Sequence, residues 1–232
     1  ATNTVVEVAV ERDILVALYQ YTAGEFWTKH NDWNSPVIHH CDWEGISCIS
    51  PGSTSRQLAD VVVDERSVEQ IDLSENNLEG SVPLSLLLLL PNLRLIRLNG
   101  NNVDYRKTAQ QEKETLGVGL DVTNVTVTSN VQHLDLSRTS VEDLNRVFTA
   151  GNGGTVIHTP YLTDFYASEA KILGSVPEFL MKMSSLERLE LEHNSLTGTL
   201  PWTLGQLQSL KYLNIADNSL EGTLPSSFNL LV

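Results

Sequence analysis

Apolar and polar residues recur along this chain in one fixed order, LxxLxLxxN. Six segments carry it: residues 68–76, 93–101, 131–139, 162–170, 186–194 and 210–218. Their last positions, 76, 101, 139, 170, 194 and 218, are 25, 38, 31, 24 and 24 residues apart, which gives a period of about 24 with two enlarged units in the middle. Such a period is typical of a solenoid, in which each unit stacks on its neighbours.

The alternating leucines of each copy predict a short strand that buries one face, so stacked copies form a parallel sheet. Four copies continue with the pattern LxGx[VL]P, at 78–83, 172–177, 196–201 and 220–225. The sequence therefore predicts an α/β solenoid with a curved parallel sheet on its concave face and irregular or 3-10 turns on its convex face. The final asparagines are expected to hydrogen-bond the backbone of adjacent coils. Thr139 and Ala170 replace two of them.

The beginning of the chain lacks the repeat and predicts a cap, which an open solenoid end requires. Apolar residues at helical spacing indicate an amphipathic helix. They are Val10, Ile14, Ala17, Leu18 and Tyr21. Cys41 and Cys48 suit a small disulfide loop better than a metal site, which needs two further ligands. The neighbouring His39 and His40 are capable of metal binding, but an exposed loop is the favoured interpretation and we predict no metal site.

The chain is thus divided into a cap and an array of repeats. The cap covers residues 1–67, with the helix, the Cys41–Cys48 loop and a lead-in strand. Six repeats cover residues 68–232, with insertions at 104–130 and 145–161. Long insertions on a rigid scaffold are often functional, and a neutral surface excursion is the equal alternative. Leu87 and Leu88 occupy positions where the fifth repeat has a polar pair. The two leucines therefore indicate either a contact surface for another chain or a shifted turn that buries one of them.

Motifs in the cap carry a resemblance to a known family. They are Ala17-Leu-Tyr, Gly24-Glu-Phe-Trp27, Asn31-Asp-Trp33 and Cys41-Asp-Trp43-Glu-Gly45-Ile-Ser-Cys48. Together with the LxGx[VL]P repeats, they resemble plant-type extracellular leucine-rich-repeat proteins, and the wording is closest to algal and protist members. The resemblance covers about three quarters of the chain. It implies a secreted or cell-surface protein, often a receptor-like ectodomain, that recognises proteins, peptides or glycans.

Charge and composition limit the classes of partner that this chain is expected to bind. With 29 acidic and 15 basic residues the net charge is −14, so nucleic acid is a poor partner, whereas cationic surfaces suit it. No apolar run is long enough to span a membrane. No leader of basic and then apolar residues is present, so any signal peptide is expected to have been removed or left out. Asn124-Val-Thr126 is a candidate N-glycosylation site.

Register predicts which strand residues face solvent on the concave side. The candidate ligand-binding residues are Asp72, Arg97, His133, Asp135, Tyr166, Arg188, Glu190, Tyr212 and Asn214. This acidic face with tyrosines suits a cationic peptide, a glycan or bridging calcium. The alternative is that these are ordinary solvated positions whose charges pair along the sheet.

Two functions remain open on the sequence. The first is an extracellular recognition module that binds its ligand through the concave face and the insertion loops. The second is a structural wall, matrix or filament protein that self-associates through the uncapped C-terminal end, since contacts that do not close grow into fibres. No catalytic motif is present, so we predict neither an enzyme nor a cofactor.

Overall fold

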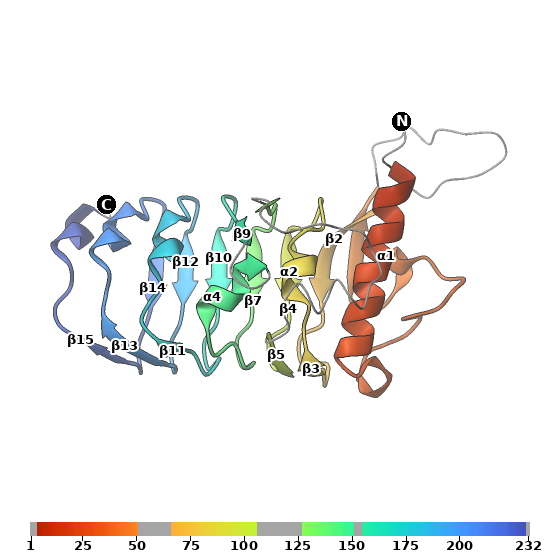
Figure 1. Cartoon of the computed structure of the whole chain (residues 1–232), viewed down its shortest axis with the longest axis horizontal. Coiled ribbons are helices and arrows are strands. Elements are labelled where there is room, and N and C mark those ends of the chain that lie inside the picture. The colour runs from red at the N-terminus through yellow and green to blue at the C-terminus, as the bar shows by residue number, and fades with distance from the viewer. Residues whose placement is uncertain (1–3, 51–65, 106–126, 151–154, 231–232) are drawn as a thin grey trace.

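A seven-stranded sheet runs the length of the molecule in the computed structural model, which describes residues 4–50, 66–105, 127–150 and 155–230. The strands lie side by side along the long axis (Figure 1). In spatial order they are β1 (Ile46–Ile49), β2 (Ser67–Asp72), β4 (Leu95–Arg97), β7 (His133–Asp135), β10 (Asp164–Tyr166), β12 (Arg188–Glu190) and β14 (Tyr212–Asn214). The pair β1–β2 is antiparallel and the others are parallel. The predicted leucine-rich-repeat solenoid is thus confirmed.

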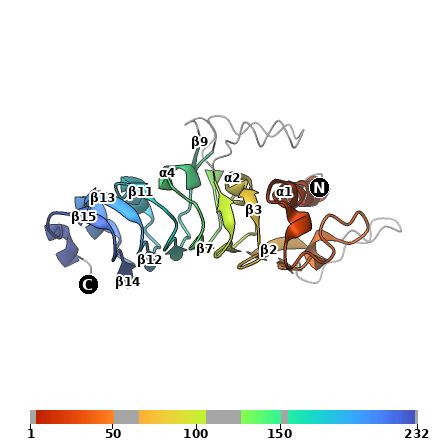
Figure 2. The ribbon, with the colours of Figure 1, turned by 90° about the horizontal axis from the view of Figure 1, so that it is seen from below.

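The second layer lies behind the sheet and consists of short helices and turns. Figure 2 shows β2, β7, β12 and β14 along one side and α1, α2 and α4 along the other. The helices of this layer are α2 (Leu84–Leu87), α4 (Leu144–Val147), η3 (Glu178–Lys182), η4 (Trp202–Gln206) and η5 (Ser226–Leu230). Two narrow sheets follow the repeat strands. They are formed by β3 (Glu79–Ser81) with β5 (Asn102–Asp104), and by β11 (Leu173–Gly174), β13 (Ser195–Thr199) and β15 (Ser219–Glu221).

The cap covers the first repeat with a helix and a disulfide loop. It comprises α1 (Thr4–Tyr21), η1 (Gly24–Phe26), η2 (His40–Asp42) and β1. Ile14, Ala17 and Leu18 are buried, as the helical spacing predicted. The disulfide between Cys41 and Cys48 is formed, with their Cα atoms 5.5 Å apart.

Aromatic rings fill the space between the cap helix and the disulfide loop. Trp33 lies at the centre of the cluster, with its ring centroid 4.8 Å from that of Trp27 and 5.0 Å from that of Trp43. Trp27 and Trp43 are almost fully buried. Such rings contribute large apolar areas, so they hold the cap helix and the disulfide loop together.

The leucines at the convex side of the first repeat belong to the core. Leu87 and Leu88 have no exposed surface, and α2 contacts α1. The interpretation of this pair as an exposed contact surface is therefore wrong, because both side chains are buried in the core.

Asparagine side chains connect consecutive coils. The Oδ1 of Asn101 accepts hydrogen bonds from the backbone N–H groups of Asn76 and Leu78, both at 3.0 Å. Its Nδ2 donates to the carbonyls of Leu73 and Leu98, both at 2.8 Å. One side chain thus satisfies backbone groups of two repeats, as predicted.

The two repeats that end in Thr139 and Ala170 differ from the asparagine-containing repeats in these side-chain hydrogen bonds. Asn194 Oδ1 accepts from the N–H groups of Ala170 and Ile172 in the preceding repeat. Thr139 Oγ1 instead donates to the carbonyl of Leu136 within its own repeat, at 2.6 Å. A threonine is too short to bond the backbone of the neighbouring coil, so the ladder of side-chain to backbone bonds is interrupted there.

The middle repeats carry an additional small sheet. Its strands are β6 (Val127–Thr128), β9 (Thr155–His158) and β8 (Thr149–Ala150), in that order. Figure 2 places β9 and α4 on the side opposite β7. In the second predicted insertion, β9 therefore lies on the convex side, away from the concave face. Asn124 and most of the insertion at 104–130 lie outside the described residues.

Candidate functional site

Two columns of side chains cross the concave face. The strand register places Gln70, Leu95, His133, Asp164, Arg188 and Tyr212 opposite one another in the first column. It places Asp72, Arg97, Asp135, Tyr166, Glu190 and Asn214 in the second. All nine predicted ligand-binding residues thus lie on one face, with neighbouring strands about 4.8 Å apart. Their role in binding stays a prediction.

The N-terminal part of this face is internally paired. Arg97 lies 3.2 Å from the Oδ2 of Asp72, and the hydroxyl of Ser74 donates to the Asp72 Oδ1 at 2.7 Å. Partial burial acts to raise the pKa of Asp72, but the hydrogen bonds from Ser74 and the Arg97 guanidinium outweigh it and lower that pKa. Asp72 therefore stays charged and is already occupied.

The C-terminal part is paired more extensively, and Arg188 is its centre. The guanidinium donates to Glu190 Oε1 at 3.1 Å and lies 3.9 Å from Asp164 Oδ1. It also lies 4.4 Å from the centre of the Tyr212 ring, which is a cation–π contact. The hydrogen bond to Glu190 raises the pKa of Arg188 further. A ligand cation would have to compete with Arg188 for these groups.

The middle of the face, on β7 and β10, has aromatic rings and an acid without a basic partner. The rings of His133 and Tyr166 lie 5.1 Å apart at an angle of 43°. Among the described residues, no arginine or lysine lies within ion-pair distance of Asp135, whose Oδ1 accepts the backbone N–H of Ser137 at 3.0 Å. This carboxylate is therefore available to a ligand.

The electrostatic environment keeps both central rings uncharged at neutral pH. Partial burial, together with the nearby Arg97, lowers the pKa of the His133 imidazole. Partial burial and the carboxylate of Asp164 raise the pKa of the Tyr166 hydroxyl. The pair thus offers flat, neutral surfaces beside the charge of Asp135, a combination that suits a ligand with both an apolar and a cationic part.

A shallow groove follows the edge of the sheet where the strands end. Two hollows of about 450 and 550 Å³ share Glu169 and Lys171, so they form one path across four repeats. Beside it, Arg138 reaches over Gly100 to Glu75, with 2.6 Å between Nη2 and Oε1. Gly100 has a positive φ of 71°, and a Cβ there would lie 2.8 Å from the Glu75 side chain. The glycine thus makes room for this ion pair.

The histidines of the cap are part of its structure. His40 is 1% exposed, and its Nε2 lies 3.4 Å from the Oε2 of the buried Glu11. The expectation of two exposed histidines is wrong for His40, because the helix brings Glu11 against it. The sulfur of Cys41 is used in the disulfide, so it does not complete a metal site with His39 and His40.

One hollow was missed by the sequence analysis. It lies at the opposite edge of the sheet, where the strands begin, and is lined by Pro91, Asn92, Arg94, Asn130, Gln132 and Tyr161. One signal in the sequence pointed to this hollow. Tyr161 directly precedes the first apolar position of its repeat, and that place is serine or asparagine in the other repeats.

Comparison with known families supports the repeat assignment. The Leucine Rich Repeat family model matches residues 185–207 and 209–231, the two most regular repeats. The structure extends the same unit to the four preceding strands of the sheet. The chain therefore has the leucine-rich-repeat fold.

Solved structures with the same fold include plant receptor ectodomains. The chain is similar to the ectodomain of the Arabidopsis thaliana receptor kinase GASSHO1/SCHENGEN3, solved in complex with CASPARIAN STRIP INTEGRITY FACTOR 2. The identity is 20% and the TM-score 0.67, over 95% of this chain but only 22% of that one. Pollen Receptor Kinase 3 matches with 24% identity and a TM-score of 0.59, over 86% of this chain and 79% of that one.

A third similar structure is the ectodomain of the Arabidopsis thaliana receptor kinase SOBIR1. It is 15% identical with a TM-score of 0.58, over 92% of this chain and 96% of that one. Identities of this size show a shared fold alone. None of the helices in the described residues combines the length and apolar character needed to cross a membrane.

Proposed function

We propose that this protein is an extracellular recognition module that binds an extended cationic peptide across the middle of its concave face. The observation that carries the proposal is the position of Asp135. Its carboxylate lies between repeats whose acids are held by Arg97 or Arg188, and it has no such partner among the described residues.

The neighbouring rings favour a peptide with an aromatic or arginine side chain. The ring of such a side chain, or its guanidinium, would pack on His133 or Tyr166 while a positive charge meets Asp135. Extended chains suit this face because successive strands present side chains about 4.8 Å apart, so a peptide laid across them, with about 3.3 Å per residue, meets side chains of several repeats. The net charge of −14 adds long-range attraction for a cationic ligand.

A location outside the reducing cytosol is supported by the disulfide, since such bonds persist in oxidising compartments. The fold of the receptor ectodomains is consistent with secretion or display at the cell surface. We retain the prediction that the module binds and does not catalyse.

The test is a charge reversal on the concave face. Binding is measured by calorimetry with synthetic extended peptides that differ in their number of lysine and arginine residues. We expect affinity to rise with positive charge, and Asp135→Lys to weaken it by about tenfold or more, which corresponds to about 1.4 kcal/mol. Glu190→Lys should have a smaller effect because Arg188 already neutralises Glu190.

Asp217→Lys is the matched control. It makes the same change of charge at the edge of the sheet, where Asp217 lies 3.2 Å from His193, and it should leave the affinity within about twofold of the wild type. Equal binding by wild type and Asp135→Lys, with both folded by circular dichroism, would place the site elsewhere. Affinity that is independent of peptide charge would contradict the cationic ligand.

A further inference from the structure

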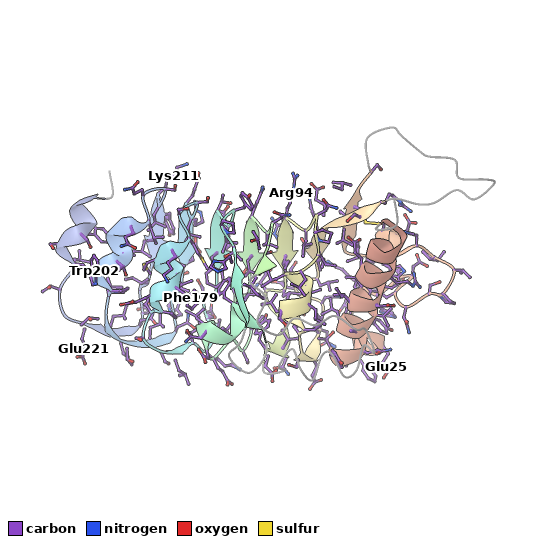
Figure 3. All side chains as sticks on the ribbon, turned by 45° about the horizontal axis from the view of Figure 1, so that its top comes forward. Glu25, Arg94, Phe179, Trp202, Lys211 and Glu221 are labelled. Atoms are coloured by element: carbon purple, nitrogen blue, oxygen red, sulfur yellow. A yellow bond between two sulfur atoms is a disulfide. The ribbon has the colours of Figure 1, made fainter. Side chains whose placement is uncertain are left out.

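A small hollow at the edge where the strands begin is built from three consecutive repeats. The segments before β4, β7 and β10 contribute its six lining residues and enclose about 260 Å³. Arg94, labelled in Figure 3, marks this edge. Drug-sized ligands occupy about 300–1,000 Å³, so this hollow suits a single small ring.

The backbone around the hollow is held firmly. Asn130 donates from its Nδ2 to the carbonyl of Pro91 at 2.6 Å and so connects two of the segments. The carbonyl of Gln132 accepts hydrogen bonds from both the N–H and the hydroxyl of Thr163, at 2.8 and 2.9 Å. These bonds fix the backbone segments that carry the lining side chains before any ligand arrives, which reduces part of the entropic cost of binding.

Tyr161 presents its ring to solvent at this hollow. The next residue, Leu162, is completely buried, and its N–H donates to the carbonyl of Thr159 to close the turn. Burial of Leu162 directs Tyr161 outward, where it is 52% exposed. In the part of the chain that the structure describes, neither the Tyr161 hydroxyl nor the Gln132 amide has a hydrogen-bond partner. The hollow therefore offers a ring face, a phenol and an amide with both donor and acceptor.

The hollow is nearly uncharged, unlike the rest of the molecule. Among the described residues that line it, the one charged residue is Arg94, whose guanidinium lies 3.6 Å from Glu69. Further along the same edge, Lys211 pairs with Glu187 at 2.7 Å. Between these pairs, the corresponding positions are the neutral Gln132 and Thr163. A neutral, hydroxyl-rich ligand suits this place better than the cationic peptide proposed for the concave face.

We propose that this hollow is a carbohydrate subsite that holds one neutral pyranose ring. The C–H face of the sugar packs on the Tyr161 ring, and its hydroxyls exchange hydrogen bonds with Gln132 and with the Oδ1 of Asn130. Amide side chains suit sugar hydroxyls because each amide can donate and accept at adjacent atoms.

The test uses the whole chain and defined sugars. The probes are glucose, galactose, mannose, xylose and N-acetylglucosamine, with β-1,4-linked oligomers of glucose and N-acetylglucosamine. Saturation-transfer NMR detects binding, and calorimetry gives the affinity. We expect millimolar binding of at least one monosaccharide. Tighter binding of the oligomer would identify a chain of sugars as the source of the ring, and equal binding would identify the free sugar.

Variants assign the binding to the hollow. Tyr161→Ala should weaken it about tenfold, Tyr161→Phe should retain most of it because the ring remains, and Gln132→Ala should weaken it several-fold. Trp202→Ala is the control, since Trp202 is a 68% exposed aromatic residue outside the hollow. Asp135→Lys should not affect sugar binding, which separates this site from the peptide site.

Three results would overturn the subsite. They are no saturation transfer with any probe, unchanged binding by Tyr161→Ala, or an equal loss in Trp202→Ala. Melting temperatures within a few degrees of wild type show that the variants are folded.

Discussion

The repeats of β12 and β14 differ from those of β7 and β10 in how fully their polar groups are satisfied. The former keep the 24-residue period and the asparagines Asn194 and Asn218. The latter carry Thr139 and Ala170 at those positions and support the additional sheet on the convex side. Departures from the repeat pattern thus gather in the middle of the molecule.

The concave side chains follow the same division. Arg188 holds Glu190 and Tyr212 of the regular part and lies near Asp164 of the adjacent repeat, whereas Asp135 in the middle has no basic partner among the described residues. A group that is already paired must lose a partner before it meets a ligand, and this cost reduces its net contribution to affinity. We therefore expect recognition at the irregular repeats rather than at the regular ones.

The largest expected effect is on the free energy of unfolding, and it distinguishes the regular repeats from the irregular ones. Asn194→Ala removes a side chain that bonds backbone groups of two coils, including the N–H groups of Ala170 and Ile172. Thr139→Ala removes one bond to the carbonyl of Leu136, and a partner of the Tyr105 hydroxyl at 3.3 Å. We expect the free energy of unfolding to fall by roughly 2–4 kcal/mol in the first variant and about 1 kcal/mol in the second.

Urea denaturation followed by circular dichroism measures both losses. Asn194→Asp is a useful companion, because it keeps an acceptor for the two N–H groups and removes the donors to the carbonyls. An equal loss in the asparagine and threonine variants would show that the ladder is not interrupted in the middle.

The sequence predicts those features that depend on period alone. Alternation fixes which residues of each strand face solvent, so both columns of the concave face follow from register. Side-chain pairing across strands is not encoded in period. Nothing in the sequence shows that Arg188 turns to Glu190, Asp164 and Tyr212 while Asp135 is left without a partner, because the outcome depends on rotamers of long side chains.

Side chains of the cap are also more buried than local sequence patterns predict. His40 follows a loop-like segment, yet it is buried because Glu11, 29 positions earlier, folds against it. The hollow beside Tyr161 joins residues from three repeats, and only the three-dimensional arrangement brings them together. Contacts between distant segments were the features that sequence reasoning missed.

A second prediction concerns the concave face of the regular repeats, where Arg188 already pairs with the acidic side chains. Arg188→Met removes the cation that holds Asp164 and Glu190, and it frees the face of Tyr212. We expect the affinity for a cationic peptide to increase several-fold, with a steeper dependence on salt, because two carboxylates become available. Calorimetry at two ionic strengths measures both changes.

Lys211→Met is the matched control for that experiment. It removes one positive charge and opens the pair with Glu187 at the edge of the sheet. A similar gain in affinity would mean that net charge alone governs binding, whereas no gain in either variant would show that Arg188 does not limit access to the face.

The smallest expected effect concerns His133 in the middle of the face. Partial burial and Arg97 lower its pKa in the folded state below the usual value of 6.5. Between that value and the lower folded pKa, the unfolded chain binds more protons, so stability decreases as the pH falls below 6.5 and the loss is complete below the folded pKa. Because the ring is half exposed, the loss should stay below about 1 kcal/mol. His133→Gln has no such proton. The free energy of unfolding, measured by urea denaturation, should therefore change less between pH 7.5 and pH 5 in this variant than in the wild type, by that amount. An identical pH dependence in both proteins would show that His133 is not the group responsible.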